Sequence, residues 1–156
     1  MIQIMVVTGH EEDRARLAGI LYQWPEFAIS GLGRDAYDAL TFARLFRPDI
    51  ALVDEDLPIL DCSEIVSALK RRSPDTRVIV LANSCDSRAV LKAIANGAAG
   101  YLLKDRDTEI IPGINSVYTG RALIGSEVIP RAFGDFPLGQ MRPRQRVKIT
   151  RKELEL

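Results

Sequence analysis

The sequence lacks the features of a secreted, disulfide-stabilised or membrane-spanning protein. Its 156 residues include only two cysteines, Cys62 and Cys85, which are too few for a disulfide framework and favour a reducing, cytoplasmic location. No apolar stretch approaches the roughly 20 residues that cross a bilayer, so no membrane partner is expected. The opening MIQIMVV has neither a basic region nor a small-residue cleavage site, which argues against a signal peptide.

An excess of charge of one sign is lacking as well. Lys and Arg together number 21, as do Asp and Glu, so this segment as a whole is not expected to hold nucleic acid electrostatically. The GLGRD stretch, with Gly31 and Gly33, has no third glycine and is a weak signal for a phosphate-binding loop. The one histidine, His10, has no second histidine with which to bind a metal. We therefore interpret His10 as a loop or helix-cap residue and predict no cofactor.

What the sequence does contain is a regular alternation of short apolar segments and amphipathic segments. Gly97 ends one of the amphipathic segments and is expected to adopt the left-handed conformation that closes a helix. Five strand–helix units predict a doubly wound α/β fold, with a parallel sheet and helices on both of its faces. The predicted strands cover residues 2–7, 27–32, 50–53, 77–81 and 100–103, and the predicted helices cover 11–22, 35–46, 63–72, 86–96 and 107–118.

Asp54 is the residue that most strongly suggests a functional site. It closes the aliphatic run 50–53, which is typical of a strand buried on both faces. The last residue of such a strand lies at the carboxyl edge of the sheet, where open α/β folds bind ligands. Asp54 is therefore predicted to present a carboxylate at that edge. The sequence leaves open where the side chains of Glu55 and Asp56, on the following loop, point.

The character of the chain changes near Gly134. Residues 134–148, rich in proline, glycine and arginine, are interpreted as a linker that follows a domain of residues 1–133. Thr150 precedes Glu153 by three residues, a spacing typical of a capping box that opens a helix. Residues 149–156 are therefore either the start of a further helical domain or a solvated tail, and spacing alone leaves both open.

Two stretches, PDIALVDEDLPILD and RVIVLANSCDSRAVLKAIANGAAGYLLKD, resemble a response-regulator receiver domain of the NarL/LuxR type. The resemblance covers roughly residues 2–130 and is most specific in GAAGYLLKD. The closing ITRKELEL resembles the opening of a LuxR-type helix-turn-helix domain, which favours the truncated-domain interpretation. The resemblance implies a flavodoxin-like, five-stranded sheet in the order 2-1-3-4-5. It also implies a partner histidine kinase, a homodimer, and DNA binding through a C-terminal domain absent from this chain.

The resemblance assigns roles to four residues. Asp54 matches the aspartate that accepts a phosphoryl group from the kinase, and Lys104 matches the lysine that pairs with the phosphoryl oxygens. Tyr101 matches the aromatic residue that changes rotamer on activation, and His10 matches a histidine common in this subfamily.

Three positions depart from the family pattern. Thr8 and Gly9 replace the acidic pair at the end of the first strand, and Ala82 replaces the hydroxyl residue at the end of the fourth. Mg²⁺ prefers oxygen ligands, carboxylates among them. Because the acidic pair is missing, we expect its binding here to be weak or absent. We predict that Lys104 pairs permanently with Asp54, and that the site is near neutral.

These departures favour an atypical receiver that is independent of Mg²⁺-dependent phosphorylation. A conventional receiver phosphorylated on Asp54 is the first alternative, and a flavodoxin-like ligand-binding protein or enzyme is the second. The output surface is expected to be fixed, with the Tyr101 ring in one inward rotamer, because Ala82 leaves room for it. Pro112 and Gly113 are expected to make the start of the fifth helix irregular. The output surface comprises residues 86–96, 100–103 and 107–118.

Overall fold

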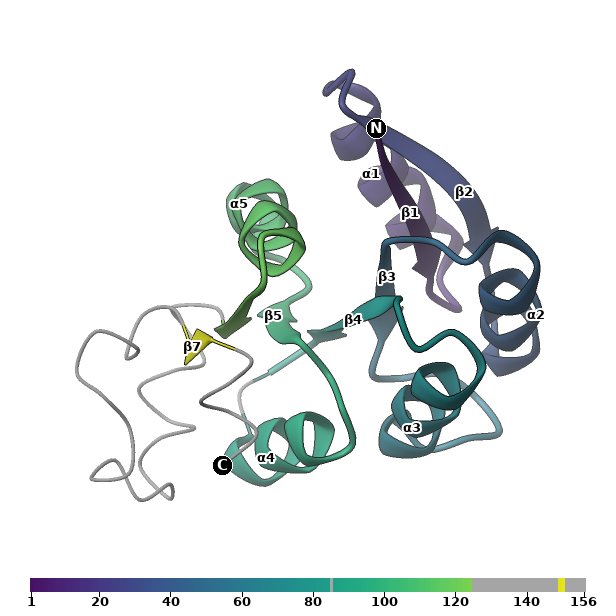
Figure 1. Cartoon of the computed structure of the whole chain (residues 1–156), viewed down its shortest axis with the longest axis vertical. Helices are drawn as coiled ribbons and strands as arrows, with labels where there is room; N and C mark the ends of the chain where they lie inside the picture. Colours follow the sequence, from purple (N-terminus) through teal and green to yellow (C-terminus); the bar gives the residue numbers. More distant parts are fainter. Residues whose placement is uncertain (85, 125–148, 151–156) are drawn as a thin grey trace.

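The computed structural model describes residues 1–84, 86–124 and 149–150, and they form alternating strands and helices (Figure 1). Each of the ten predicted elements is present within two residues of its expected ends. The strands are β1 (Ile2–Val7), β2 (Phe27–Gly33), β3 (Ile50–Asp54), β4 (Arg77–Ala82), β5 (Gly100–Leu103), β6 (Arg121–Ile124) and β7 (Ile149–Thr150). The helices are α1 (Glu11–Tyr22), α2 (Ala36–Phe46), α3 (Cys62–Arg72), α4 (Ser87–Ala95) and α5 (Asp107–Tyr118).

The strands form one sheet in the order β2-β1-β3-β4-β5-β6-β7. Its first five strands are parallel and follow the predicted order 2-1-3-4-5, which confirms the flavodoxin-like α/β fold. Strands β6 and β7 extend the edge beyond β5 and were not predicted; β6 is parallel to β5, and β7 is antiparallel to β6. The predicted linker at 134–148, and the helix expected after Thr150, lie outside the described residues.

Helices cover both faces of the sheet, α1 and α5 on one side and α2, α3 and α4 on the other (Figure 1). Two hydrophobic cores result, because alternate strand residues point to opposite faces. Leu52 and Leu102 pack toward α1 and α5, whereas Val53 and Tyr101 pack toward α2, α3 and α4. Every residue of β3 is buried, as its unbroken aliphatic run predicted. None of the described helices has the length and apolar character needed to span a membrane.

Side-chain caps position the helices that surround the candidate site. Asp35 caps α2, and Asp86 caps α4 by accepting a hydrogen bond from the Arg88 N–H. Asp61 and Glu64 form a reciprocal capping box at the start of α3. Gly97, after α4, has a φ of 111°, so the left-handed conformation expected of it is confirmed.

The prediction of an irregular start to the fifth helix was wrong. Helix α5 begins at Asp107 and continues through Pro112 to Tyr118. Proline removes one helical hydrogen bond, but the helix buries one apolar face, which includes Ile110 and Ile114, against the sheet. The Arg77 guanidinium also donates to the carbonyl of Val117, at 2.9 Å, in the last turn. Tertiary packing therefore outweighs the local cost of Pro112.

Candidate functional site

Three side chains meet at the carboxyl edge of the sheet. Thr8 follows β1, Asp54 ends β3 and Lys104 follows β5. Because side chains alternate along a strand, these three lie on the same face as the core residues two positions before them, the face covered by α1 and α5. The parallel register brings the strand ends together, with Val7 beside Val53.

Asp54 is completely buried, and both of its carboxylate oxygens accept hydrogen bonds. Oδ2 accepts from the Thr8 hydroxyl and from the Lys104 ammonium, each at 2.8 Å, and Oδ1 accepts from the Asp56 N–H at 3.0 Å. The predicted ion pair between Asp54 and Lys104 is therefore present. Thr8 acts as a hydrogen-bond donor to the carboxylate.

Asp13, in the first turn of α1, is a second carboxylate at this site that the sequence analysis missed. Its Oδ2 lies 3.4 Å from the Lys104 ammonium, and its Oδ1 lies 3.4 Å from the Arg16 guanidinium. Arg16 also pairs with Asp107, so the three carboxylates of this network face two cations, and the five groups sum to a charge of −1. The predicted pair of Asp54 and Lys104 therefore belongs to a larger network that carries a small excess of negative charge.

Lys104 keeps its charge in this setting. Burial of the ammonium lowers its pKa, but the hydrogen bond and the charge of Asp54, with a smaller contribution from Asp13, outweigh burial. The pKa of Lys104 is consequently raised above its ordinary value. Lys104 is thus a permanent cation held between two carboxylates.

A site for Mg²⁺ would need hard oxygen ligands in octahedral order at about 2.0–2.1 Å. His10, Asp13 and Asp54 each offer one ligand atom, and these atoms lie within 4.8 Å of one another. One of the three is an imidazole nitrogen, and both oxygens of Asp54 already bind other groups. Thr8 and Gly9 supply no carboxylate at all. This donor set does not fit Mg²⁺, and His10 occupies the N-cap position of α1, as predicted.

A second polar centre lies on the opposite face of the sheet, at the end of β4. Ala82 is completely buried and contributes no polar side-chain atom. Tyr101, 1% exposed, points inward as predicted, and its hydroxyl donates to Glu55 Oε1 at 3.0 Å. Glu55 Oε2 accepts from the N–H of Asn83 at 2.9 Å. The Glu55 side chain, whose direction the sequence left open, therefore contacts two other segments.

Tyr101 remains a neutral phenol at physiological pH. Burial raises its pKa above the ordinary value, and the negative charge of Glu55 and the hydrogen bond to it raise it further. The phenol is therefore a stable donor to the carboxylate.

Residues 4–113 match the sequence model of a family described as the response regulator receiver domain. The chain belongs to this family. The transcriptional regulatory protein DegU of Brevibacillus brevis is 33% identical over 81% of the chain, and the match covers 54% of DegU. The DNA-binding transcriptional activator DevR/DosR of Mycobacterium tuberculosis is 32% identical over 80% of the chain and 58% of its own length. The chain thus spans little more than half of these relatives.

Solved structures agree with the fold of this receiver domain. The receiver domain of the putative response regulator NarL from Mycobacterium tuberculosis has a TM-score of 0.73 at 28% identity, covering 77% of this chain and 98% of that one. A LuxR-family response regulator from Aurantimonas has a TM-score of 0.78 at 23% identity, covering 91% of this chain and 99% of that one. The chain is a receiver domain of two-component systems whose relatives are transcription regulators.

The receiver domain has a broad hollow whose lining includes Asp13 and Lys104, and the buried Asp54 is not part of that lining. Its volume is about 880 Å³, and Arg16 and Lys104 lie among many acidic side chains in its lining. An acidic rim repels an anionic phosphodonor unless a cation neutralises it. The five carboxylate residues of the lining are Glu11, Glu12, Asp13, Asp105 and Asp107.

Cys62, the first residue of α3, is a partly buried free thiol. Burial, followed by the charges of Glu55 and Asp61, raises its pKa to about 12. At neutral pH the thiol is protonated and a poor nucleophile. Cys85, the other cysteine of the sequence, lies outside the described residues.

Proposed function

We propose that this receiver domain controls a DNA-binding transcription regulator without Mg²⁺-dependent phosphorylation of Asp54. The observation that carries the proposal is the state of Asp54, which is buried and has both oxygens occupied. The Lys104 ammonium, the group that would pair with a phosphoryl oxygen, already pairs with Asp54 and Asp13. The Asp54 carboxylate thus has its charge paired with the Lys104 ammonium and no oxygen without a donor, which disfavours a phosphoryl group or a metal at this residue.

Phosphoryl transfer to Asp54 would have to overcome three obstacles. An attacking carboxylate oxygen must first lose a hydrogen bond, from either Thr8 and Lys104 or Asp56. The incoming phosphoryl group brings negative charge that is usually neutralised by Mg²⁺, and the donor set does not suit that ion. The acidic rim of the hollow adds repulsion.

The partners in this proposal follow from the relatives. DegU is called a transcriptional regulatory protein and DevR/DosR a DNA-binding transcriptional activator, so DNA would be contacted by a C-terminal domain absent from this chain. We propose that the domain acts in the cytoplasm as a homodimer and that the output surface, formed by α4, β5 and α5, carries its state onward. A histidine kinase would then bind without transferring a phosphoryl group, or would be dispensable.

The second candidate is a conventional receiver that is phosphorylated on Asp54. One observation favours it, because Asp13 brings a second carboxylate to the edge at which Asp54 and Lys104 lie. A flavodoxin-like enzyme or ligand-binding protein gains no support from the relatives, which are transcription regulators.

Beryllofluoride, which mimics a phosphoryl group on aspartate, separates the two candidates. Sedimentation velocity of the chain is expected to give the same association state with and without beryllofluoride and Mg²⁺. Asp54→Asn, which has no carboxylate to modify, is the matched control and should behave like the unmodified chain. A monomer-to-dimer shift in the unmodified chain that Asp54→Asn abolishes would restore the conventional switch.

A further inference from the structure

Glu55 connects three parts of the domain that are distant in sequence. Its backbone N–H donates to the Leu81 carbonyl of β4 at 2.9 Å. Its two carboxylate oxygens accept from the Asn83 N–H at 2.9 Å and from the Tyr101 hydroxyl at 3.0 Å. One residue at the end of β3 therefore binds the last part of β4, the turn after it, and β5.

The buried position of Tyr101 depends on a partner for its hydroxyl. The ring is 1% exposed and belongs to the core that packs against α2, α3 and α4. A buried phenol without a hydrogen-bond acceptor is strongly disfavoured. The neighbouring Ala82 offers no side-chain oxygen, and the acceptor that the structure provides is the ionised carboxylate of Glu55. Hydrogen bonds to an ionised acceptor are the stronger kind.

We propose that Glu55 is a positioning residue that holds the Tyr101 ring inside the core and fixes the turn between β4 and α4. The carboxylate is part of the chain, so this arrangement requires no bound group. This proposal deepens the proposed function. One of its consequences, that the output surface keeps one conformation, rests on the proposed function.

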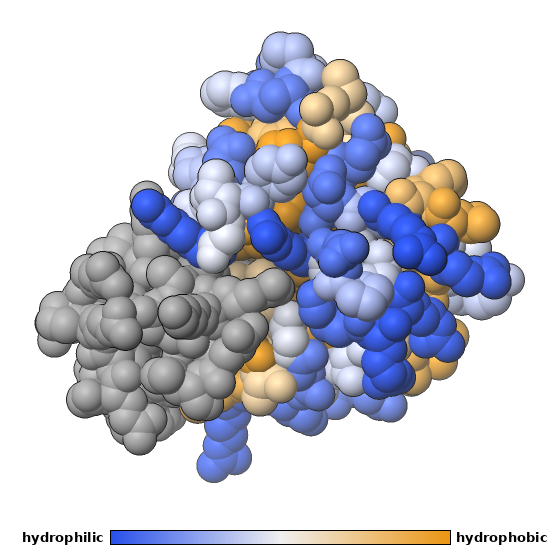
Figure 2. Space-filling model, in the orientation of Figure 1, coloured by the Kyte–Doolittle hydropathy of each residue, from blue (hydrophilic) through white to orange (hydrophobic). Residues whose placement is uncertain are grey.

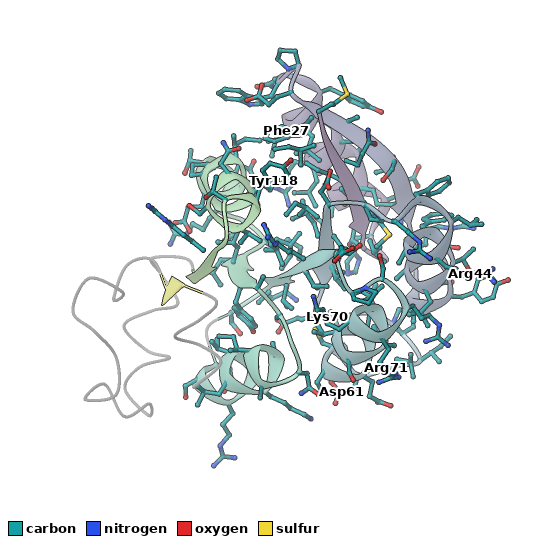
Figure 3. All side chains as sticks on the ribbon, viewed as in Figure 1. Phe27, Arg44, Asp61, Lys70, Arg71 and Tyr118 are labelled. Atoms are coloured by element: carbon teal, nitrogen blue, oxygen red, sulfur yellow. The ribbon has the colours of Figure 1, made fainter. Side chains whose placement is uncertain are left out.

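The surroundings of Glu55 explain how this contact reaches the output surface. Glu55 and Tyr101 line a cavity of about 300 Å³ between α3 and α4. Asp61, the N-cap residue of α3 (labelled in Figure 3), also lines this cavity and forms an ion pair of 3.1 Å with Lys92 of α4. Glu55 thus binds the backbone at Asn83, just after β4, and Asp61 binds Lys92 within α4. Hydrophilic residues cover most of the described surface in this view, and apolar residues are exposed in smaller, separate areas (Figure 2).

The test uses NMR of the chain with carbon-13-labelled tyrosine. The chain has four tyrosines, and Tyr101 differs from Tyr22, Tyr37 and Tyr118 because those three are exposed. Glu55→Ala removes the acceptor and the charge, Glu55→Gln removes the charge but keeps an acceptor oxygen, and Asp56→Ala is the matched control.

In Glu55→Ala, the Tyr101 ring is expected to become accessible to a soluble paramagnetic probe. The Asn83 amide should exchange with solvent roughly tenfold faster or more, because it loses a hydrogen bond to a charged acceptor. Glu55→Gln should keep the ring shielded, and the carbon-13 shift of the Tyr101 ring should change because its hydroxyl then donates to a neutral acceptor. Asp56→Ala removes an equal charge one residue away, from an exposed side chain, and should change neither measurement.

A shielded Tyr101 and unchanged Asn83 exchange in Glu55→Ala would overturn the inference. If that variant does not fold, Glu55→Gln decides, because an unchanged carbon-13 shift of the Tyr101 ring there would show that the carboxylate does not contact the phenol. Phosphorylation of Asp54 in the unmodified chain would refute the proposed function without altering these readouts. A shielded Tyr101 in Glu55→Ala would refute the role of Glu55 and leave the proposed function standing.

Discussion

Replacing Lys104 by alanine is expected to lower the free energy of unfolding by about 3 kcal/mol, as is usual when one partner of a buried ion pair is removed. Asp54 is completely buried and would keep only the hydrogen bonds from Thr8 and Asp56, with no cation in contact. Asp13 would lose the same ammonium and keep Arg16. Urea denaturation at neutral pH measures the change.

The control is the double variant Lys104→Ala with Asp54→Asn. The asparagine amide is neutral and requires no cation beside it. Removal of Lys104 should therefore lower the free energy of unfolding far less in the Asp54→Asn background. A coupling of about 2 kcal/mol between the two substitutions is expected, at the upper part of the range for contacting residues. Strict additivity of the two changes would contradict the account, because it would mean that the ammonium does not stabilise the charge of Asp54.

The second large effect is expected from the double substitution Thr8→Asp and Gly9→Asp, which returns carboxylates to the acidic-pair positions. The Thr8 hydroxyl donates to Asp54 at 2.8 Å, so a carboxylate there replaces a donor with a like charge. A Cβ at Gly9 would meet the Arg34 carbonyl at 3.5 Å, an ordinary contact, so a side chain fits there. Without metal, the variant should be less stable than the unmodified chain by about 2–3 kcal/mol.

Mg²⁺ should restore that stability in the variant and leave the unmodified chain unchanged. A ligand at one hundred times its dissociation constant stabilises a folded protein by about 2.7 kcal/mol, which is enough to offset the expected loss. Thermal unfolding with and without Mg²⁺ gives the readout. Thr8→Asn with Gly9→Asn, similar in size but neutral, should show no response to Mg²⁺. Equal stabilisation of the unmodified chain by Mg²⁺ would mean that Asp13, Asp54 and His10 already form a working site.

Most of the fold could be predicted from the sequence because its signals are local. Aliphatic runs bounded by turn residues mark buried strands, and Gly97 marks the end of a helix. The same local pattern brought Asp54 to the carboxyl edge, and its pairing with Lys104 followed from the resemblance together with the missing acidic pair. The strand positions and the position of Asp54 could be predicted because burial or charge determines which residue types occur there.

The missed features depend on contacts between segments that are distant in sequence. Asp13 lies in an acidic first helical turn, where such residues are favoured by the helix dipole, so nothing local distinguished it as a partner of Lys104. The direction of the Glu55 side chain depends on Tyr101, 46 residues later. Strand β6 has four residues and gains its pairing from β5. The effect of Pro112 on the helix was overestimated, because helix propensity takes no account of the packing of α5 on the sheet.

We expect Asp54 to accept no phosphoryl group under conditions that suit a conventional receiver. The most direct test is to incubate the chain with acetyl phosphate and Mg²⁺ at neutral pH and to measure its intact mass. The expected spectrum contains the unmodified chain alone, and Asp54→Asn treated in the same way should likewise show no added phosphoryl group. A species heavier by one phosphoryl group, formed by the unmodified chain and absent from Asp54→Asn, would contradict this expectation.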